Sequence, residues 1–176
     1  MPGPIAAGVL YTGGPWPYGY VGLGEVFVFL FFGLVAVNGS YYVQLEELDW
    51  LPFALSISIG CLVTAILVVN NIRDIDTDRR AGKRTLAVRI GRKPTRAVYL
   101  GLLVLGFLVG LGALLVAEAP WWSGLLLAAV WVPLARPPAQ AVSRRTDGPS
   151  LNKALAQTGA LLGLVSLALS AGLIAN

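Results

Sequence analysis

The chain has 176 residues, of which 56% are apolar and 12% charged, and it carries a net charge of +4 with a mean hydropathy of +0.73. A soluble domain of this length needs far more polar surface to cover its core, so the composition excludes one and indicates an integral membrane protein, surrounded by lipid and not by nucleic acid. The absence of histidine and the single cysteine exclude imidazole metal sites, histidine acid–base chemistry and a disulfide within one chain.

Five stretches without Asp, Glu, Lys or Arg predict membrane-spanning helices. Four of them are long enough to cross a hydrocarbon core of roughly 30 Å at about 1.5 Å per residue. The fourth in chain order is short, and it either tilts little or continues past Arg136. The sequence therefore predicts an all-α, polytopic transmembrane helical bundle of about five spans, forming a single membrane domain over residues 1–176. The predicted spans are residues 26–43, 51–69, 97–117, 121–135 and 154–175.

The basic residues predict how these spans are oriented. All thirteen Lys and Arg lie in two segments, nine in residues 73–96 and four in residues 136–153, whereas the other connections carry only acids. Because basic loops are retained in the cytoplasm, the five spans alternate without conflict. We expect a multi-pass protein of the plasma membrane, with residues 11–22 and both basic segments in the cytoplasm and the C-terminus outside.

Some residues within the spans predict packing rather than chemistry. Asn38 is costly in lipid and is expected to make an interhelical hydrogen bond. Glu25 stands at the start of its helix, where the helix dipole favours an acid and no ligand is needed. Small residues let helices approach closely in a membrane. Close packing is expected at Gly101, Gly106, Gly110, Gly112, Gly159, Gly163 and Gly172.

Eight charges follow the second predicted span, within NNIRDIDTDRRAGKRT at residues 70–85. Asn70, Asp74 and Asp78 are spaced i, i+4, i+8, so on a helix they fall within roughly 80° of one another and form one oxygen-rich stripe. Asp76 lies on another face, where solvation or a local ion pair explains it. Acids at a helix C-terminus are disfavoured by the dipole and by each other, so a positive group must compensate them.

Two interpretations of that positive group are open. Neighbouring arginines, Arg73 among them, predict a solvated, salt-bridged turn. Two carboxylates and an amide oxygen also fit Mg²⁺, which takes oxygen ligands and is typically bound together with substrate phosphates. Gly82 permits a turn after the stripe, and Lys83 and Arg84 then supply donors suited to phosphate oxygens. The combination fits ionisation of an allylic diphosphate, whose leaving group is stabilised by metal and cations while the carbocation alkylates an acceptor. The motif alone does not separate this reaction from other chemistry of metal-bound diphosphates.

The segment NNIRDIDTDRRAGKRTLAVRIGR resembles the second aspartate-rich motif of the UbiA superfamily of intramembrane prenyltransferases. Together with YTGGPWPYGYVGLGEVFVFLFFGLVAVNGSYY, residues 11–42, it is similar to the branch that prenylates 1,4-dihydroxy-2-naphthoate in menaquinone biosynthesis. The resemblance extends over essentially the whole chain. It implies an enzyme with Mg²⁺ as cofactor and with polyprenyl diphosphate and 1,4-dihydroxy-2-naphthoate as substrates, and it leaves the prenyl chain length open.

The resemblance also implies roles for single residues. The family's metal-binding positions fall on Asn70, Asp74 and Asp78, of which Asp74 and Asp78 are catalytic, while Lys83 and Arg84 face the diphosphate. Family members have nine transmembrane helices and a first aspartate-rich motif after the second helix, and this sequence resembles their last five helices. We therefore expect a C-terminal portion of such an enzyme, which does not catalyse prenyl transfer without an N-terminal half.

Three alternatives remain open. One is a UbiA relative that prenylates a different aromatic acceptor. Another is a five-helix part of a transporter, whose charged loops only set topology. A CDP-alcohol phosphotransferase also places acids on membrane helices over a divalent metal, but its motif needs an Asp-Gly and an Ala-Arg pair ahead of two further acids, an order that residues 74–85 lack. Substitution of Asp74 or Asp78 separates enzyme from transporter, because only the enzyme then loses activity.

Overall fold

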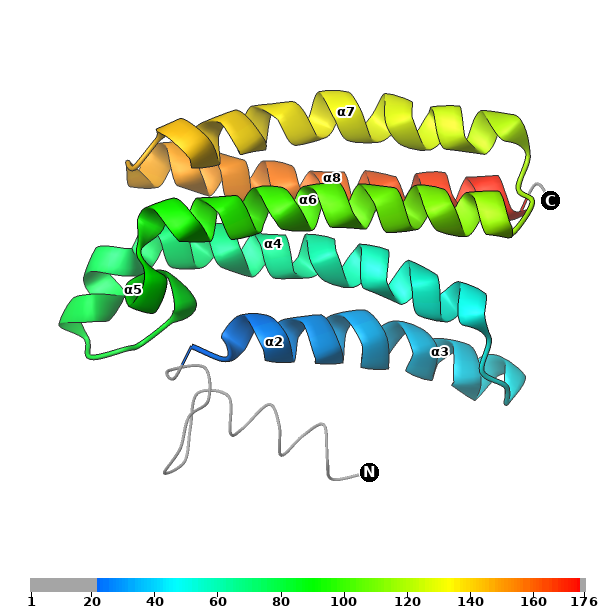
Figure 1. Ribbon diagram of the computed structural model, residues 1–176, viewed down its shortest axis with the longest axis horizontal. Coiled ribbons are helices and arrows are strands. Elements are labelled where there is room, and N and C mark those ends of the chain that lie inside the picture. The colour runs from blue at the N-terminus through cyan, green and yellow to red at the C-terminus, as the bar shows by residue number, and fades with distance from the viewer. Residues whose placement is uncertain (1–21, 175–176) are drawn as a thin grey trace.

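The architecture is a bundle of long helices. The structure is a computed structural model, and it describes residues 22–174, in which every regular element is helical and no strand occurs. The predicted cytoplasmic residues 11–21 and the last residue of the predicted span 154–175 lie outside the described range. In chain order the elements in Figure 1 are α2 (Gly24–Val28), the π-helix η2 (Phe29–Val35), α3 (Ala36–Leu45), α4 (Trp50–Arg80), α5 (Leu86–Ile90), α6 (Arg92–Val116), α7 (Trp121–Arg144) and α8 (Gly148–Ile174).

Five helices of the described chain are long and apolar enough to cross a membrane, which confirms the predicted all-α, polytopic class. The elements α2, η2 and α3 join into the first of them, Gly24–Leu45, and α4, α6, α7 and α8 form the others. The helices α4, α6, α7 and α8 all extend into charged sequence at one end of their uncharged stretches. Helix α4 continues through the charged motif to Arg80, and α6 already begins at Arg92.

Helix α7 shows how the shortest predicted span is lengthened. The apolar stretch 121–135 continues without a break past Arg136 to Arg144, which is the second of the two expected arrangements. It does so although three prolines lie inside the helix and lack the amide N–H that a helix needs. Neighbouring helices and local adjustments make such prolines tolerable in membranes. The prolines are Pro133, Pro137 and Pro138.

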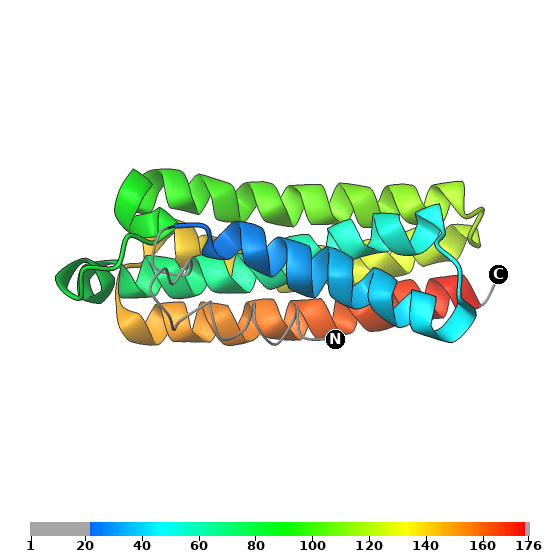
Figure 2. The same cartoon turned by 90° about the horizontal axis from the view of Figure 1, so that it is seen from below.

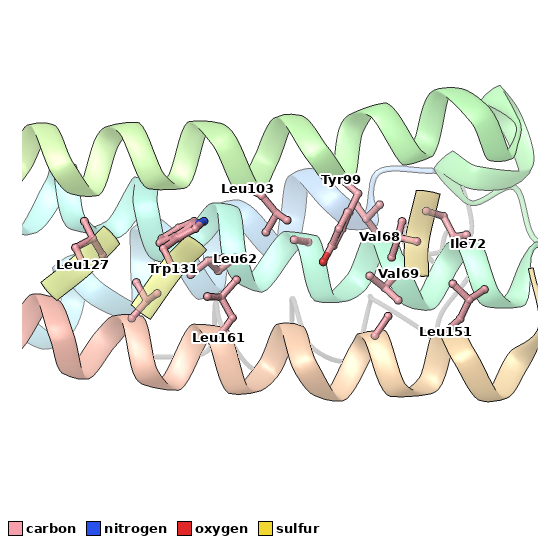
Figure 3. Close-up of a cluster of buried hydrophobic side chains, with 14 of the residues drawn as sticks. Leu62, Val68, Val69, Ile72, Tyr99, Leu103, Leu127, Trp131, Leu151 and Leu161 are labelled. Atoms are coloured by element: carbon pink, nitrogen blue, oxygen red, sulfur yellow. The ribbon is translucent and has the colours of Figure 1, made fainter. Parts of the chain in front are cut away.

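Helix α4 is the centre of the bundle. It packs against α6 and α8, and α7 in turn packs on α8 and α6. Because neighbours enclose it, α4 buries apolar residues on several sides, including Leu62, Val69 and Ile72. In Figure 3 these side chains lie among those of the neighbouring helices, such as Tyr99 of α6. Because neighbouring helices hold α4 in place, the position of its charged end relative to them is also fixed.

The first span packs on α4 through a close crossing of two glycines. A Cβ added at Gly33 of η2 would lie 2.7 Å from the Cα of Gly60, and one added at Gly60 would lie 3.1 Å from ring atoms of Phe29. Gly33 therefore requires glycine, whereas a side chain at Gly60 would press against the Phe29 ring and the Gly33 backbone. The wider turn of a π-helix, which usually appears as a single turn within an α-helix, occurs at this crossing.

The glycine expectation is right at three positions and wrong at four. A Cβ at Gly106, Gly110 or Gly172 would lie within 3.2 Å of another helix, the closest approach being 2.7 Å between Gly172 and Ser123. The other glycines have no such neighbour within 4 Å, because spacing along a sequence does not tell which side of a helix faces protein. The four without close packing are Gly101, Gly112, Gly159 and Gly163.

Both basic segments lie at the same end of the bundle. The connection with α5 and the turn between α7 and α8 meet there, whereas the turn from α3 to α4 and the turn from α6 to α7 lie at the other end (Figures 1 and 2). A guanidinium nitrogen of Arg96 donates to the backbone oxygen of Arg145 at 2.6 Å, which joins the two segments directly. One end of the bundle therefore carries nearly all of the positive charge.

Candidate functional site

The oxygen-rich stripe lies on α4 where this helix reaches the charged end of the bundle. Asn70, Asp74 and Asp78 stand on one unbroken helix, as the sequence predicts. The side chain of Asp74 is 31% exposed and that of Asp78 is 12% exposed, so the stripe turns from a more open face of α4 towards a buried one. Within the described residues, no three or more His, Cys, Asp and Glu side chains gather as a metal centre. The stripe contributes two carboxylates and one amide.

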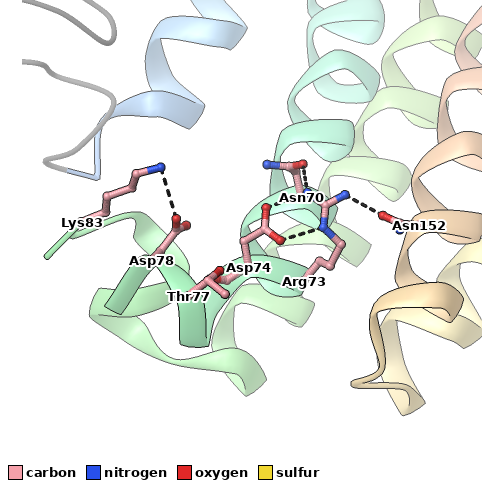
Figure 4. Close-up of polar contacts among 7 residues, drawn as sticks. All are labelled: Asn70, Arg73, Asp74, Thr77, Asp78, Lys83 and Asn152. Atoms are coloured by element: carbon pink, nitrogen blue, oxygen red, sulfur yellow. Dashed lines mark hydrogen bonds and ion pairs between the residues drawn. The ribbon is translucent and has the colours of Figure 1, made fainter. Parts of the chain in front are cut away.

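Arg73 gathers the upper part of this stripe around one guanidinium (Figure 4). Its Nε and Nη2 donate to the two carboxylate oxygens of Asp74 at 2.7 and 2.6 Å, and Nη2 also donates to Oδ1 of Asn70 at 2.7 Å. A bidentate arginine–carboxylate pair is among the stronger polar contacts in proteins. The expected compensating cation is therefore present, and it binds the same oxygens that the resemblance assigns to a metal.

The same guanidinium connects the motif to the last helix. Nη1 of Arg73 donates to Oδ1 of Asn152 at 2.6 Å, across a separation of 79 residues in the sequence. Asn152 lies in the first turns of α8, which packs along α4. The contact fixes the side of α4 that carries Asn70 and Asp74 relative to α8.

The lower part of the stripe is joined to the loop that follows α4. The ammonium nitrogen of Lys83 lies 3.4 Å from Oδ1 of Asp78, and the backbone N–H of Lys83 donates to the backbone oxygen of Asp78 at 2.9 Å. Gly82 makes this return possible with φ +74°, a left-handed conformation that glycine adopts without strain. Arg84 is exposed beside this turn. The turn brings one of the two predicted diphosphate-binding cations to the stripe.

Asp76 serves a different purpose, as its helical phase predicts. Its carboxylate accepts from Nη2 of Arg92 at 3.2 Å, and Nη1 of Arg92 donates to the backbone oxygen of Ile72 at 3.2 Å. Arg92 is the first residue of α6, so the pair holds the start of α6 against the end of α4. Because the side chain of Asp76 is 70% exposed, we assign to this ion pair a modest contribution to stability.

Sequence reasoning explained Glu25 by the helix dipole alone and gave Asn71 no role, but the structure joins the two near the stripe. Glu25 of α2 is buried, with 7% of its surface exposed, and its Oε1 accepts a hydrogen bond from Nδ2 of Asn71 at 2.8 Å. The Oε2 atom of Glu25 is buried and has no hydrogen-bond partner within residues 22–174. The sequence held two signals that could have pointed to this pair, namely an acid next to an apolar span and a second asparagine directly after Asn70.

Taken together, the fold and the site define a polytopic helical membrane protein with carboxylate, amide and cationic groups joined at one end of a central helix. The chain belongs to the UbiA prenyltransferase family, whose model matches residues 2–161. This match sets aside the transporter and the CDP-alcohol phosphotransferase as alternatives.

Curated relatives carry more specific names. A protein of Mycobacterium tuberculosis named 1,4-dihydroxy-2-naphthoate octaprenyltransferase is 44% identical over 169 residues, which cover 96% of this chain and 56% of the relative. The protein of the same name in Escherichia coli is 40% identical over 161 residues, covering 90% of this chain and 51% of the relative. The chain thus spans about half the length of these relatives. No solved structure matches it.

Proposed function

We propose that this chain forms the part of an intramembrane prenyltransferase that binds the diphosphate of a polyprenyl diphosphate and transfers the prenyl group to 1,4-dihydroxy-2-naphthoate, a step of menaquinone biosynthesis. The observation that carries the proposal is the joined set of Asn70, Arg73, Asp74, Asp78 and Lys83 at the end of α4. The substrates come from the names of the relatives, which describe those proteins.

The donor set of the stripe fits Mg²⁺. Three oxygens of Asn70 and Asp74 already accept hydrogen bonds from a single cationic group, the guanidinium of Arg73, so they converge on positive charge. Hard oxygen ligands from one or two carboxylates, completed by waters and phosphate oxygens, are what Mg²⁺ prefers. We assign Asn70, Asp74 and Asp78 as the residues that would hold the ion. Bound there, Mg²⁺ would neutralise negative charge on the leaving diphosphate.

The chain's own cations act on the same leaving group. Lys83 lies beside Asp78 and Arg84 follows it in the exposed loop, so both can donate to phosphate oxygens at the edge of the membrane. Asp74 and Asp78 act as catalytic residues through the charge that they place at this point. The polyprenyl chain then extends into the apolar region beside α4, where lipid or protein excludes water from the carbocation.

The proposed orientation follows from the distribution of charge. Both basic segments stand at one end of the bundle, which we assign to the cytoplasm of a cell whose plasma membrane holds the protein. The loop with Lys83 and Arg84 is then cytoplasmic and the C-terminus is outside. Accessibility of single introduced cysteines to a membrane-impermeant reagent, at Arg84→Cys and at Glu118→Cys after Cys61→Ser, tests this assignment from both sides.

A chimera tests the function. The matching segment of the Mycobacterium tuberculosis relative is replaced by this chain, and membranes are assayed for incorporation of labelled prenyl diphosphate into 1,4-dihydroxy-2-naphthoate. We expect prenylation that chelation of divalent cations abolishes. A second reaction with 4-hydroxybenzoate as acceptor tests the alternative of another aromatic substrate. An active chimera that is indifferent both to chelation and to Asp74→Ala would contradict the proposed site, and one that prefers 4-hydroxybenzoate would contradict the proposed acceptor.

A further inference from the structure

The buried carboxylate of Glu25 is the polar group whose surroundings the proposed diphosphate site does not explain. One of its oxygens, Oε1, is satisfied by Asn71 at 2.8 Å. The other, Oε2, is buried and has no partner among the described residues. Burying an unpaired carboxylate oxygen is costly, and such a group in a native structure calls for an explanation beyond packing. The interhelical hydrogen bond to Asn71 satisfies one of the two carboxylate oxygens of Glu25 and leaves the other without a partner within the described residues.

The position of the pair relates it to the proposed reaction. Asn71 precedes Asp78 by seven residues, so the two lie within about 20° of one another on α4 and about 10 Å apart along its axis. Glu25 and Asn71 therefore continue the inner face of the stripe towards the apolar middle of the bundle. On the other side, a Cβ added at Gly22 would lie 2.8 Å from the backbone oxygen of Arg84, so the chain just before α2 touches the loop of the proposed diphosphate cations.

The chemistry of Oε2 selects the class of ligand. An ionised carboxylate oxygen only accepts hydrogen bonds, so its partner must be a donor. A diphosphate is excluded because two anions would repel each other in a poorly solvated place. A metal ion is disfavoured because Asn71 directs its Nδ2 donor at Glu25, and within the described residues no group of three or more His, Cys, Asp or Glu side chains that could hold a metal lies there. A hydroxyl group fits, and the proposed acceptor is an aromatic ring that carries two of them.

We propose that Glu25, held in place by Asn71, binds a hydroxyl of the aromatic acceptor and takes its proton during prenyl transfer. This inference rests on the proposed function. The O–H bond breaks, its proton moves to Oε2 of Glu25, and its electron pair remains on the naphthoate oxygen. That charge makes the ring carbon a stronger nucleophile, which forms the new C–C bond and gives a C-alkylated ketone. The C–O bond of the prenyl diphosphate breaks at the same stage, and its electron pair leaves with the diphosphate.

Asn71 is a positioning residue in this scheme. Its Nδ2 donates a hydrogen bond to Oε1 of Glu25, which leaves Oε2 as the oxygen that can bind the substrate. A carboxylate fixed at one oxygen presents the other in a defined direction, which is what proton transfer at hydrogen-bond distance requires. Its substitution should therefore act through Glu25, and the double variant should be no worse than Glu25→Gln alone.

Binding to the full chain in lipid nanodiscs tests the first half of the proposal. The probes are 1,4-dihydroxy-2-naphthoate, followed by its fluorescence, and Mn²⁺ with farnesyl diphosphate, followed by electron paramagnetic resonance. We expect Glu25→Gln, which keeps the shape of the side chain, to weaken naphthoate binding about tenfold and to leave Mn²⁺ and diphosphate binding unchanged. Glu118→Gln, a neutralised acid at the opposite end of the bundle, is the matched control and should change neither.

The pH dependence of prenyl transfer in the chimera tests the proton step. With Glu25 present, the rate at pH 7 does not require the free hydroxyl to ionise. In Glu25→Gln the hydroxyl must ionise before transfer, so we expect the rate of prenyl transfer to fall at neutral pH and to recover towards alkaline pH. The KM for the prenyl diphosphate should stay the same. Glu25→Asp, a shorter carboxylate, should recover part of the neutral rate.

Several outcomes would overturn the inference. They are unchanged naphthoate binding in Glu25→Gln, a loss of Mn²⁺ binding in that variant, or a lowered melting temperature together with equal weakening of every ligand, which would indicate a structural role. Failure of the proposed function looks different. In that case the unsubstituted chimera transfers no prenyl group to the naphthoate, whereas the chain still binds the dihydroxy compound through Glu25.

Discussion

The first span, Gly24–Leu45, and the central helix α4 are both apolar, yet within residues 22–174 protein surrounds only α4. In the most apolar part of each helix, 6% of the residues of the first span are buried, against 56% of those of α4. The first span contacts α4 through one side, and large side chains such as Phe32 and Val43 remain exposed. Apolar character in a membrane therefore does not tell protein-facing from lipid-facing surface, because lipid tails are as apolar as leucine.

Polar groups separate the two helices better than apolar ones do. In the first span, Nδ2 of Asn38 donates to the backbone oxygen of Leu34 at 2.8 Å, within the same helix. The expectation of an interhelical bond for Asn38 is therefore wrong. In α4, Oγ of Ser58 donates to the backbone oxygen of Gly106 at 2.7 Å, across to α6. In this structure the half-buried amide of the first span is satisfied within its own helix, whereas the buried hydroxyl of α4 connects two helices.

The sharpest test of this difference is chemical. We expect Asp74→Ala or Asp78→Ala, placed in the chimera, to reduce prenyl transfer by a hundredfold or more, because loss even of groups that only orient metal ligands costs about 10- to 100-fold. Asp76→Ala, on the same helix but paired with Arg92 instead, should reduce it far less. Equal losses in all three variants would show that charge density matters and helical phase does not. The measurement is the initial rate with labelled prenyl diphosphate at saturating Mg²⁺.

The second test concerns the crossing that joins the two helices. Gly33→Leu introduces a side chain whose Cβ alone would lie 2.7 Å from the Cα of Gly60, so the first span must move away from α4. We expect a loss of stability of about 1–3 kcal/mol, typical of overpacking. The readout is the midpoint of unfolding in detergent with increasing denaturant.

Gly39→Leu is the matched control, on the same helix, where nothing lies within 4 Å of an added Cβ. It should leave the midpoint unchanged. If both variants destabilised the protein equally, the loss of glycine itself would be responsible and the crossing would not.

The sequence predicted the spans and the stripe because both depend on local information. About twenty uncharged residues define a span, and the phase of a helix is enough to align Asn70, Asp74 and Asp78 and to set Asp76 aside. The contacts of Arg73 with Asn152 and of Glu25 with Asn71 join residues 79 and 46 positions apart. They depend on which helices are neighbours, and no periodicity in a single sequence encodes that.

A third test measures a buried polar contact between helices. The hydroxyl groups of Tyr99 in α6 and Thr158 in α8 lie 2.9 Å apart, and both residues are fully buried. We expect Tyr99→Phe to destabilise the bundle by about 0.5–1.5 kcal/mol, which is the usual range for such a hydrogen bond in membranes and in water. Thr158→Val and the double variant complete a thermodynamic cycle. Strict additivity of the two single effects would mean that the hydrogen bond between them contributes nothing.

The smallest effect is expected at Asn38, and it decides whether local satisfaction is the rule for the first span. Asn38→Leu removes an amide that bonds only to its own helix among the contacts of the described chain, and it replaces that amide by a residue which lipid solvates well. We expect the unfolding midpoint in nanodiscs to change by less than the equivalent of about 0.5 kcal/mol, in either direction. A loss as large as that of Tyr99→Phe would mean that Asn38 meets another protein surface in the membrane, and the first span would then be an interface and not a lipid-facing edge.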